Sequence, residues 1–235
     1  MAISEPYELD GVTVGTTELS IVSGTTTLQT VTDDGIYNLW LDPAGAALAQ
    51  GDEFKWRVYE KVLSAGTKRV VFQGTMSDAN VEPVVVPPLY LLHGWDMTLQ
   101  KIAGTDRAFD ASIRAVTGAG LTEYDSMSAV SVGTTELSII SGTTTLQTVT
   151  DDGFYQLWID PVTNMVKADQ FDIRIYETVE GTGGTKRQVI KATVLDDQAE
   201  LFVTAPLCLI NGWDMTIQGV SATARAFDAS VRRIA

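Results

Sequence analysis

Few residues of this chain have side chains suited to catalysis or metal binding. The single histidine, His93, is a potential general base, and the single cysteine, Cys208, is a potential nucleophile. Asp33-Asp34 and Asp151-Asp152 are paired carboxylates ahead of a glycine, and two facing carboxylates can hydrolyse a glycosidic bond. Calcium needs roughly six to eight oxygen ligands, which is more than one such pair supplies.

These residues do not add up to a known catalytic set. One histidine and one cysteine are too few for the usual zinc ligands, and the chain has no nucleophile elbow, no P-loop and no G-x-G-x-x-G. We therefore predict no enzymatic activity, no catalytic residue, no cofactor and no metal. We expect His93 to form hydrogen bonds in a loop, Cys208 to fill the core, and the aspartate pairs to sit in tight turns.

A second group of residues suits surface contacts. Trp40 and Trp158 alternate with more apolar neighbours on their strands, so each is expected on the less apolar face, as a contact residue or a core anchor. Arg107 and Asp110 recur as Arg225 and Asp228, and each pair is expected either to form an ion pair or to contact a neighbouring subunit. These six residues are the predicted interaction surface.

The chain is an internal duplication, which is the strongest signal in the sequence. Val14–Pro43 and Val132–Pro161 differ at only four of 30 positions, at an offset of 118 residues. The segments Gly94–Thr98 and Arg107–Ser112 recur at the same offset. A repeat of this length is far longer than a solenoid unit and matches a self-sufficient domain.

Each copy has the apolar pattern of an all-β fold. The segment 54–60 alternates apolar and polar side chains, as expected of a half-buried antiparallel strand. Further strands are predicted at 19–21, 26–31, 37–41, 68–74, 84–86, 95–102 and 108–116, and a short helix over 106–116 is an alternative for the last. About eight strands per copy predict two tandem antiparallel β-sandwich domains of jelly-roll or immunoglobulin-like type.

The predicted domain organisation follows from the repeat. Residues 1–11 are expected to be an N-terminal leader, 12–116 the first sandwich, 117–129 a flexible linker with two glycines, and 130–235 the second sandwich. The copies diverge most in three pairs of loops, at 44–53/162–170, 62–66/179–184 and 77–83/195–200. We expect those loops to make unequal contacts in the two domains.

Charge and hydropathy limit the partners. The net charge of −14 disfavours binding to phosphate backbones, so nucleic acid is not an expected partner, and a basic protein surface is. No signal peptide is recognisable at the N-terminus, and no apolar run approaches the ~20 residues that span a bilayer. The chain is expected to be made in a cytoplasm and to have no membrane partner.

The run VGTTELSI…GTTTLQT…DDGIYNLWLD and the closing RAFDASIR resemble virion proteins encoded near the major capsid gene of tailed bacteriophages. In size, β-sandwich character and scarcity of catalytic residues the chain is similar to capsid decoration or cement proteins. The resemblance implies a virion location and the major capsid protein or another virion protein as partner. It identifies no binding residues.

Two further functions remain open at this point. One is a tail or host-recognition module that binds carbohydrate through exposed Trp and Tyr, and the other is a carbohydrate-active enzyme that uses paired carboxylates. A homo-oligomer is expected, with a trimer preferred and a dimer as the alternative. Duplicated domains matching repeated sites on a capsid would gain avidity.

Overall fold

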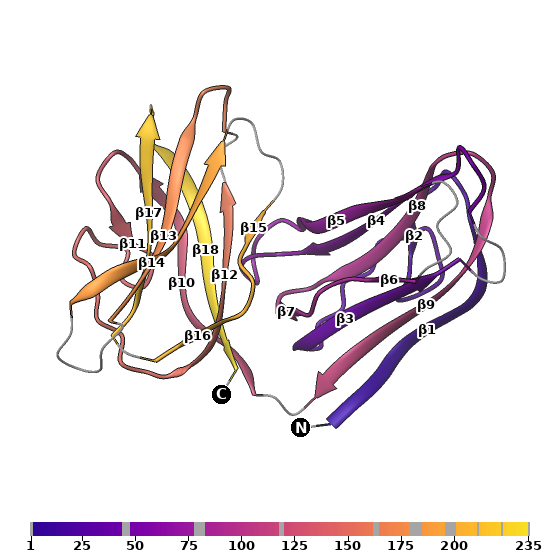
Figure 1. Cartoon of the computed structure of the whole chain (residues 1–235), viewed down its shortest axis with the longest axis horizontal. Helices are drawn as coiled ribbons and strands as arrows, with labels where there is room; N and C mark the ends of the chain where they lie inside the picture. Colours follow the sequence, from indigo (N-terminus) through magenta and orange to yellow (C-terminus); the bar gives the residue numbers. More distant parts are fainter. Residues whose placement is uncertain are drawn as a thin grey trace. The chain divides into compact units, whose positions relative to one another are not determined.

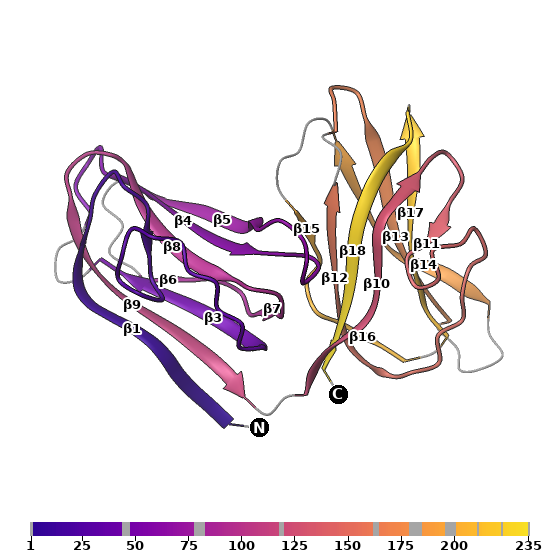
Figure 2. The same cartoon turned by 180° about the vertical axis from the view of Figure 1, so that it is seen from behind.

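The computed structural model describes residues 2–43, 48–77, 83–117, 120–161, 165–178, 185–195, 201–210, 212–221 and 223–234. Every regular element within these ranges is a β-strand, so the predicted all-β class is confirmed. The chain divides into two compact units, Met1–Leu121 and Thr122–Ala235. Each unit has two antiparallel sheets (Figures 1 and 2).

The described residues of the first unit form nine strands. One sheet has the order β1-β9-β3-β6, with β7 also paired to β3, and the other has the order β2-β8-β4-β5. The bounds are β1 Ala2–Val14, β2 Leu19–Ser20, β3 Gly35–Asp42, β4 Glu53–Glu60, β5 Arg69–Ser77, β6 Val84–Val85, β7 Leu89–Leu91, β8 Asp96–Ala103 and β9 Arg107–Thr117.

The second unit repeats this plan. Its sheets have the orders β10-β18-β12-β15, with β16 paired to β12, and β11-β17-β13-β14. The bounds are β10 Leu121–Val132, β11 Leu137–Ser138, β12 Gly153–Pro161, β13 Gln170–Thr178, β14 Lys186–Leu195, β15 Phe202–Val203, β16 Leu207–Leu209, β17 Asp214–Ser221 and β18 Arg225–Ile234.

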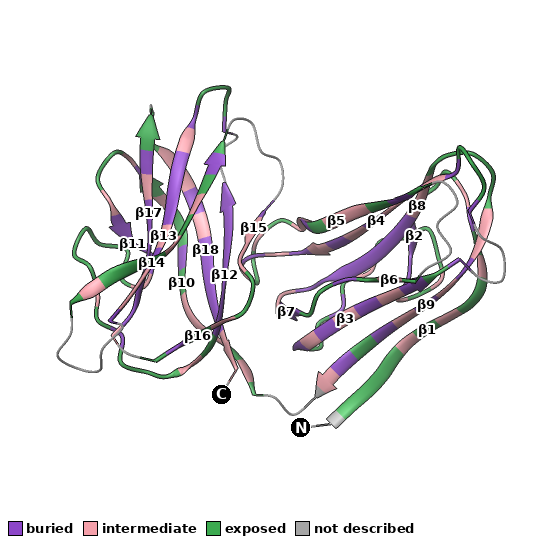
Figure 3. Cartoon of the chain, in the orientation of Figure 1, coloured by how far each residue is buried: buried purple, intermediate pink, exposed green. Residues whose placement is uncertain are grey.

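The core of each unit lies between its two sheets, because alternate side chains of each strand point inward. In β3 the buried residues Tyr37, Leu39 and Leu41 alternate with partly exposed ones, and Figure 3 shows the same alternation in other strands. Trp95 is at the centre of the first core, with the Tyr37 ring centroid 4.3 Å away. Its indole Nε1 donates to the carbonyl of Asp33 at 3.0 Å.

The N-terminal segment and most of the linker are strands, which corrects the predicted boundaries. Residues 1–11 were expected to be a leader, but β1 pairs along its length with β9, and Tyr7 packs edge-on against Trp95. Most of the predicted linker 117–129 lies in β10, which pairs with β18 in the second unit. Pairing with a strand about a hundred residues away cannot be read from local composition.

Three local predictions were also wrong. The segment 26–31 forms no strand, because its amides turn to other partners: Gln29 N donates to the Asp96 carboxylate at 2.7 Å, and Val31 forms an isolated bridge with Trp95. Asp33 and Asp34 were expected in a tight turn, but they lie in an irregular segment ahead of β3. The alternative of a helix over 106–116 fails because that segment is strand β9.

Candidate functional site

The outward face of the β1-β9-β3-β6 sheet in the first unit carries the most distinctive surface of the described residues. Strands β3 and β9 pair so that outward side chains meet in four rows. Along the strands, these rows change from apolar to acidic: Ile36 with Val116, Asn38 with Arg114, Trp40 with Ser112, and Asp42 with Asp110. The inward residues between them, such as Leu39 and Ile113, are fully buried and hold the sheet on the core.

Trp40 is fixed in the middle of this face by polar contacts. The Arg114 guanidinium lies over the indole, 4.0 Å from the ring centroid, which is a cation–π contact. The Trp40 Nε1 donates to the Asn38 Oδ1, and the Asn38 Nδ2 donates to the Val86 carbonyl. The ring is therefore held in one orientation, with part of its surface exposed.

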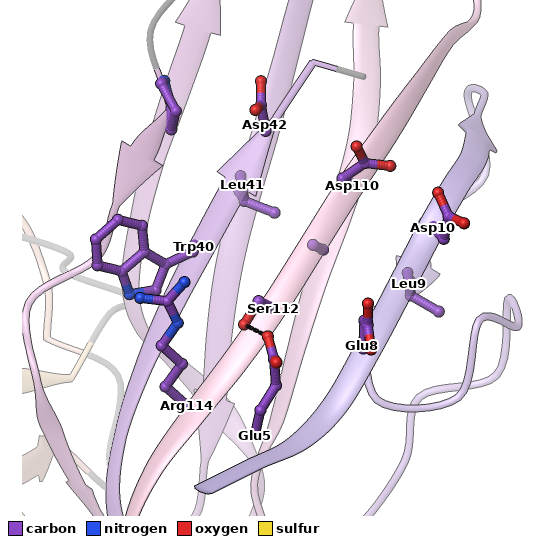
Figure 4. Close-up of a pocket in the computed structure, with 12 residues that line it drawn as sticks. Glu5, Glu8, Leu9, Asp10, Trp40, Leu41, Asp42, Asp110, Ser112 and Arg114 are labelled. Carbon is purple, nitrogen blue, oxygen red and sulfur yellow. Dashed lines mark hydrogen bonds between the residues drawn. The ribbon is translucent and has the colours of Figure 1, made fainter. Parts of the chain in front are cut away.

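Two grooves meet at Trp40 and Arg114, each with a volume of about 450 Å³. The acidic groove carries five carboxylates, and Figure 4 shows them on three neighbouring strands, with Trp40 and Asp42 on β3, Asp110 on β9, and Glu5, Glu8 and Asp10 on β1. The apolar groove lies toward the other end of the strands. Its apolar lining residues are Ile3, Ile36, Val85, Pro88, Ala115 and Val116, and the carboxylates of the acidic groove are those of Glu5, Glu8, Asp10, Asp42 and Asp110.

The second unit has the same rows on β12 and β18. Arg232 lies over the Trp158 ring at 3.9 Å, the Trp158 Nε1 donates to the Gln156 Oε1 at 3.0 Å, and the Gln156 Nε2 donates to the Thr204 carbonyl at 2.8 Å. Here Trp158 and Arg232 are buried. The stacked Trp–Arg pair thus recurs in both repeats, with Asn38 replaced by Gln156, and it is accessible in the first.

The predicted Arg–Asp contacts have other partners. The Arg107 Nε binds the buried Asp52 Oδ2 at 2.7 Å, and Asp110 accepts a hydrogen bond from the amide of Gly11 at 2.7 Å. Arg107 therefore ties β9 to the loop before β4, and Asp110 ties β9 to a bulge in β1.

The same exchange of partners occurs in the second unit. The Arg225 Nε binds the Asp169 Oδ2 at 2.7 Å, and the Asp228 Oδ1 accepts from the amide of Ala129 at 2.7 Å. Gly11 and Ala129 both have positive φ, so each aspartate holds a left-handed residue in place. Of the six predicted surface residues, Trp40 and Asp110 come together at the grooves, whereas Arg107 has a structural role.

The buried carboxylates of Asp52 and Asp96 accept hydrogen bonds from the chain around them. Amides of Thr105 and Ala49, together with Arg107, lower the pKa of Asp52 to about 2. Burial raises the pKa of Asp96, which accepts hydrogen bonds from the Ser20 hydroxyl and the amides of Gln29 and Met97. These aspartates attach loops to strands, so their role is structural.

The single histidine and cysteine lie apart from this chemistry. The amide of His93 donates to the buried Glu60 carboxylate at 2.7 Å, as expected of a loop residue, while its register partner Asn211 lies outside the described residues. Cys208 is exposed, so the prediction that it fills the core was wrong. No cluster of three or more His, Cys, Asp or Glu residues suited to a metal ion occurs in the described part of the chain.

Sequence reasoning missed Arg114 and the acids of β1. Arg114 recurs as Arg232, so the repeat itself carried a signal for the stacked pair. Glu5, Glu8 and Asp10 were assigned to a leader, and only the pairing of β1 with β9 brings them to the face. Among the described residues, no helix is long and apolar enough to cross a membrane.

No family model matches this chain, and no curated protein matches it. Solved structures with a likeness to it include the PBSX exported protein XepA, at 8% identity and TM-score 0.29, covering 100% of this chain and 86% of that one. PNGase F, a glycosylasparaginase from Flavobacterium meningosepticum, is similar at 10% identity and TM-score 0.40, covering 100% and 96%. The T=3 Penaeus vannamei nodavirus is similar at 9% identity and TM-score 0.27, covering 100% and 89%.

These likenesses correct one prediction. The chain was predicted not to be an enzyme, but the solved structures that it resembles over its whole length include PNGase F, an enzyme. The two-unit all-β architecture therefore does not exclude catalysis. At these identities and TM-scores the likeness assigns neither a family nor a function.

Proposed function

We propose that this chain is a structural protein of a phage virion, which decorates or cements the capsid and binds other virion proteins through its duplicated β-domains. The observation that carries the proposal is the stacked Trp40–Arg114 pair between an apolar and an acidic groove. Tryptophan and arginine are the side chains most enriched where protein interfaces concentrate their binding energy. The neighbouring apolar groove allows close packing around them.

The acidic groove favours a partner with basic side chains. Its carboxylates add to a chain charge of −14, so the field attracts positively charged protein surfaces and accelerates their association. The repeat places the same Trp–Arg rows in both units. The pair is accessible in the first unit, and two homologous units in one chain suit the repeated sites of a capsid, because a second contact becomes intramolecular after the first.

The carbohydrate-binding alternative gains no support from the tryptophans. A sugar stacks on an open aromatic face, but Arg114 covers one face of Trp40, and Trp158 is buried beneath Arg232. No observation on the described residues favours a sugar platform over a protein contact.

Quantitative mass spectrometry of gradient-purified phage particles tests the proposal. We expect the chain to be present at a copy number comparable to that of the major capsid protein. Its absence from particles, in a lysate that contains it in free form, would refute the proposal.

A pair of variants tests the face itself. We expect Trp40→Ala to lower particle-bound copies at least tenfold, in line with the loss of a central interface tryptophan. The matched control Leu28→Ala removes an exposed apolar side chain elsewhere in the same unit and should leave occupancy unchanged. Far-UV circular dichroism verifies that both variants fold, and full occupancy with folded Trp40→Ala would exclude this face.

A further inference from the structure

The acidic groove is built largely by one edge strand. Strand β1 carries Glu5, Glu8 and Asp10 and has no Lys or Arg, and all three carboxylates are on exposed residues. It pairs with β9 on one side only, so its other edge is open in the first unit. Like charges on such an edge oppose its pairing with another copy of itself.

The second unit has an edge strand of the opposite charge. Strand β14 carries Lys186, Arg187 and Lys191 and has no Asp or Glu, although the chain contains 30 acidic residues. It pairs with β13 only. Two of its apolar side chains, Val189 and Leu195, are 42% and 47% exposed. Within the unit, the Lys191 Nζ binds the buried Asp172 Oδ2 at 2.8 Å, and Lys186 donates to the Gln147 carbonyl. A partner with acids and an apolar surface would add to these contacts and cover the exposed apolar side chains.

The two edges differ only in part between the repeats. Strand β5 is the counterpart of β14 in the first unit. It also lacks Asp and Glu and has Arg69 where β14 has Arg187, but it has Gln73 and Ser77 where β14 has Lys191 and Leu195. Strand β10 is the counterpart of β1. Tyr7 and Tyr124 make the same contact with the core tryptophan, and Gly11 and Ala129 occupy the same bulge.

The β1/β10 alignment shows which acids are lost. These two anchors place Thr122 where β1 has Glu5, and Ser128 where β1 has Asp10. Strand β10 still carries Glu123 and Asp125, so the first unit has the more acidic edge strand and the second unit the more basic and apolar one.

We infer that strand β14 of one copy binds the acidic and apolar grooves of the first unit in a second copy. Its cationic side chains match the carboxylates around Asp42 and Asp110, and Val189 and Leu195 match the apolar groove. From Arg187 to Leu195 the strand spans roughly 26 Å, and the four rows from Ile36 to Asp42 span roughly 20 Å. The two surfaces therefore agree in charge, polarity and length.

Such a contact joins different surfaces of identical chains. A head-to-tail interface generates a ring when its rotation closes and an open chain when it does not. Like edges repel each other and unlike edges attract, so the charge pattern selects this head-to-tail contact over a symmetric one. The inference narrows the proposed function by naming a second copy as the virion protein that occupies the face.

Sedimentation velocity on the purified full chain tests this contact, with the sister strands as templates for conservative variants. Lys191→Gln/Leu195→Ser gives β14 the residues of β5, and Glu5→Thr/Asp10→Ser gives β1 the residues of β10. We expect the wild-type chain to associate with rising concentration and to dissociate at high salt. Each variant should weaken the association at least tenfold.

The matched control is Val166→Ser/Lys167→Gln, which also removes one charge and one exposed apolar side chain from the second unit. It should associate like the wild type. The decisive sample is an equimolar mixture of the two variants at a concentration where each alone is monomeric. Because one variant keeps an intact β14 and the other an intact groove, the mixture should form dimers and nothing larger.

Three results would overturn the inference: a wild-type chain that is monomeric at every concentration, variants that associate as the wild type does, or a mixture that stays monomeric. The assay contains no virion, so its outcome is independent of the particle measurement. A monomer that occupies particles would refute the self-association and leave the proposed function standing. A chain that forms oligomers but is absent from particles would refute the proposed function and leave the self-association standing.

Discussion

At the scale of single residues, the fold depends on buried carboxylates that bind backbone amides. Asp52 accepts from the amides of Ala49 and Thr105, each at 2.9 Å, and from Arg107. Asp96, in β8, accepts hydrogen bonds from Ser20 in β2, from the amide of Gln29 in a loop and from the amide of Met97. Their pKa values move in opposite directions, because hydrogen bonds to the charged form dominate at Asp52 and burial dominates at Asp96.

The pH dependence of stability follows from the shift at Asp52. Its folded pKa of about 2 lies below the unfolded value of 3.8, so its contribution is complete above pH 3.8 and is lost as pH falls through 2. Asp96 has a raised pKa, so its ionisation disfavours folding as pH rises through the folded pKa. The contributions of Asp52 and Asp96 to the free energy of unfolding therefore change with pH in opposite directions.

We predict that Asp52→Asn weakens the loss of stability that the first unit suffers at acid pH. Guanidinium unfolding between about pH 4 and pH 2 should show a free energy of unfolding that falls for the wild type and falls less for the variant. Asp42→Asn is the control, because Asp42 is exposed. Equal slopes for wild type and Asp52→Asn would contradict the assignment.

Asp96→Ala should destabilise the first unit by roughly 3 kcal/mol. The substitution leaves the amides of Gln29 and Met97 and the hydroxyl of Ser20 without their acceptor, and each buried donor left so costs about 1–3 kcal/mol. Chemical denaturation measures the loss. The exposed Asp42→Ala should stay within about 0.5 kcal/mol of wild type, and a similar small effect at Asp96 would show that water replaces the carboxylate.

At the scale of elements, β1 and β10 are each the edge strand of one sheet in their unit. Strand β1 shifts register twice against β9, between Ser4 and Tyr7 and between Leu9 and Val12. Gly11 lies in the second irregularity at φ +57°, with its amide bound to Asp110. Bulges and acidic side chains protect this edge from unspecific pairing.

Gly11→Val is predicted to destabilise the first unit by roughly 1–2 kcal/mol. A β-branched residue is disfavoured at positive φ, and no atom lies within 4 Å of the added Cβ, so the cost comes from the backbone alone. Thermal unfolding followed by circular dichroism measures it. Thr13→Val, on the same strand, serves as the control. Equal melting temperatures for the two variants would show that the bulge adapts.

At the scale of the whole molecule, the chain consists of two units, each with its own pair of sheets and its own tryptophan-centred core. The second unit begins at β10, since Met127 is buried in its core and Tyr124 packs against it. The boundary between the units therefore lies at the start of β10 and not at residue 130.

A chain running from Leu121 to Ala235 should fold by itself, and one running from Val130 should not. The shorter chain lacks most of the strand that covers β18, together with Tyr124 and Met127. Near-UV circular dichroism and cooperative thermal unfolding distinguish the two. Cooperative unfolding of the shorter chain with an unchanged melting temperature would restore the original boundary.

The sequence by itself determined the duplication, the all-β class and the outward position of Trp40, because repeat identity and a period of two are local patterns. Only the tertiary structure decided which strands close the sheets and which side chains meet. Arg107 binds Asp52, which is 55 residues away in the sequence, and Asp110 accepts a hydrogen bond from Gly11, which is 99 residues away. Such pairs depend on strand order and register, which no local spacing encodes.

For the same reason the acids of β1 were assigned to a leader. They line a groove with Trp40 and Asp42 only after β1 has paired with β9, and β9 with β3. The pairing of distant strands therefore places the polar residues of the N-terminal segment in the candidate site.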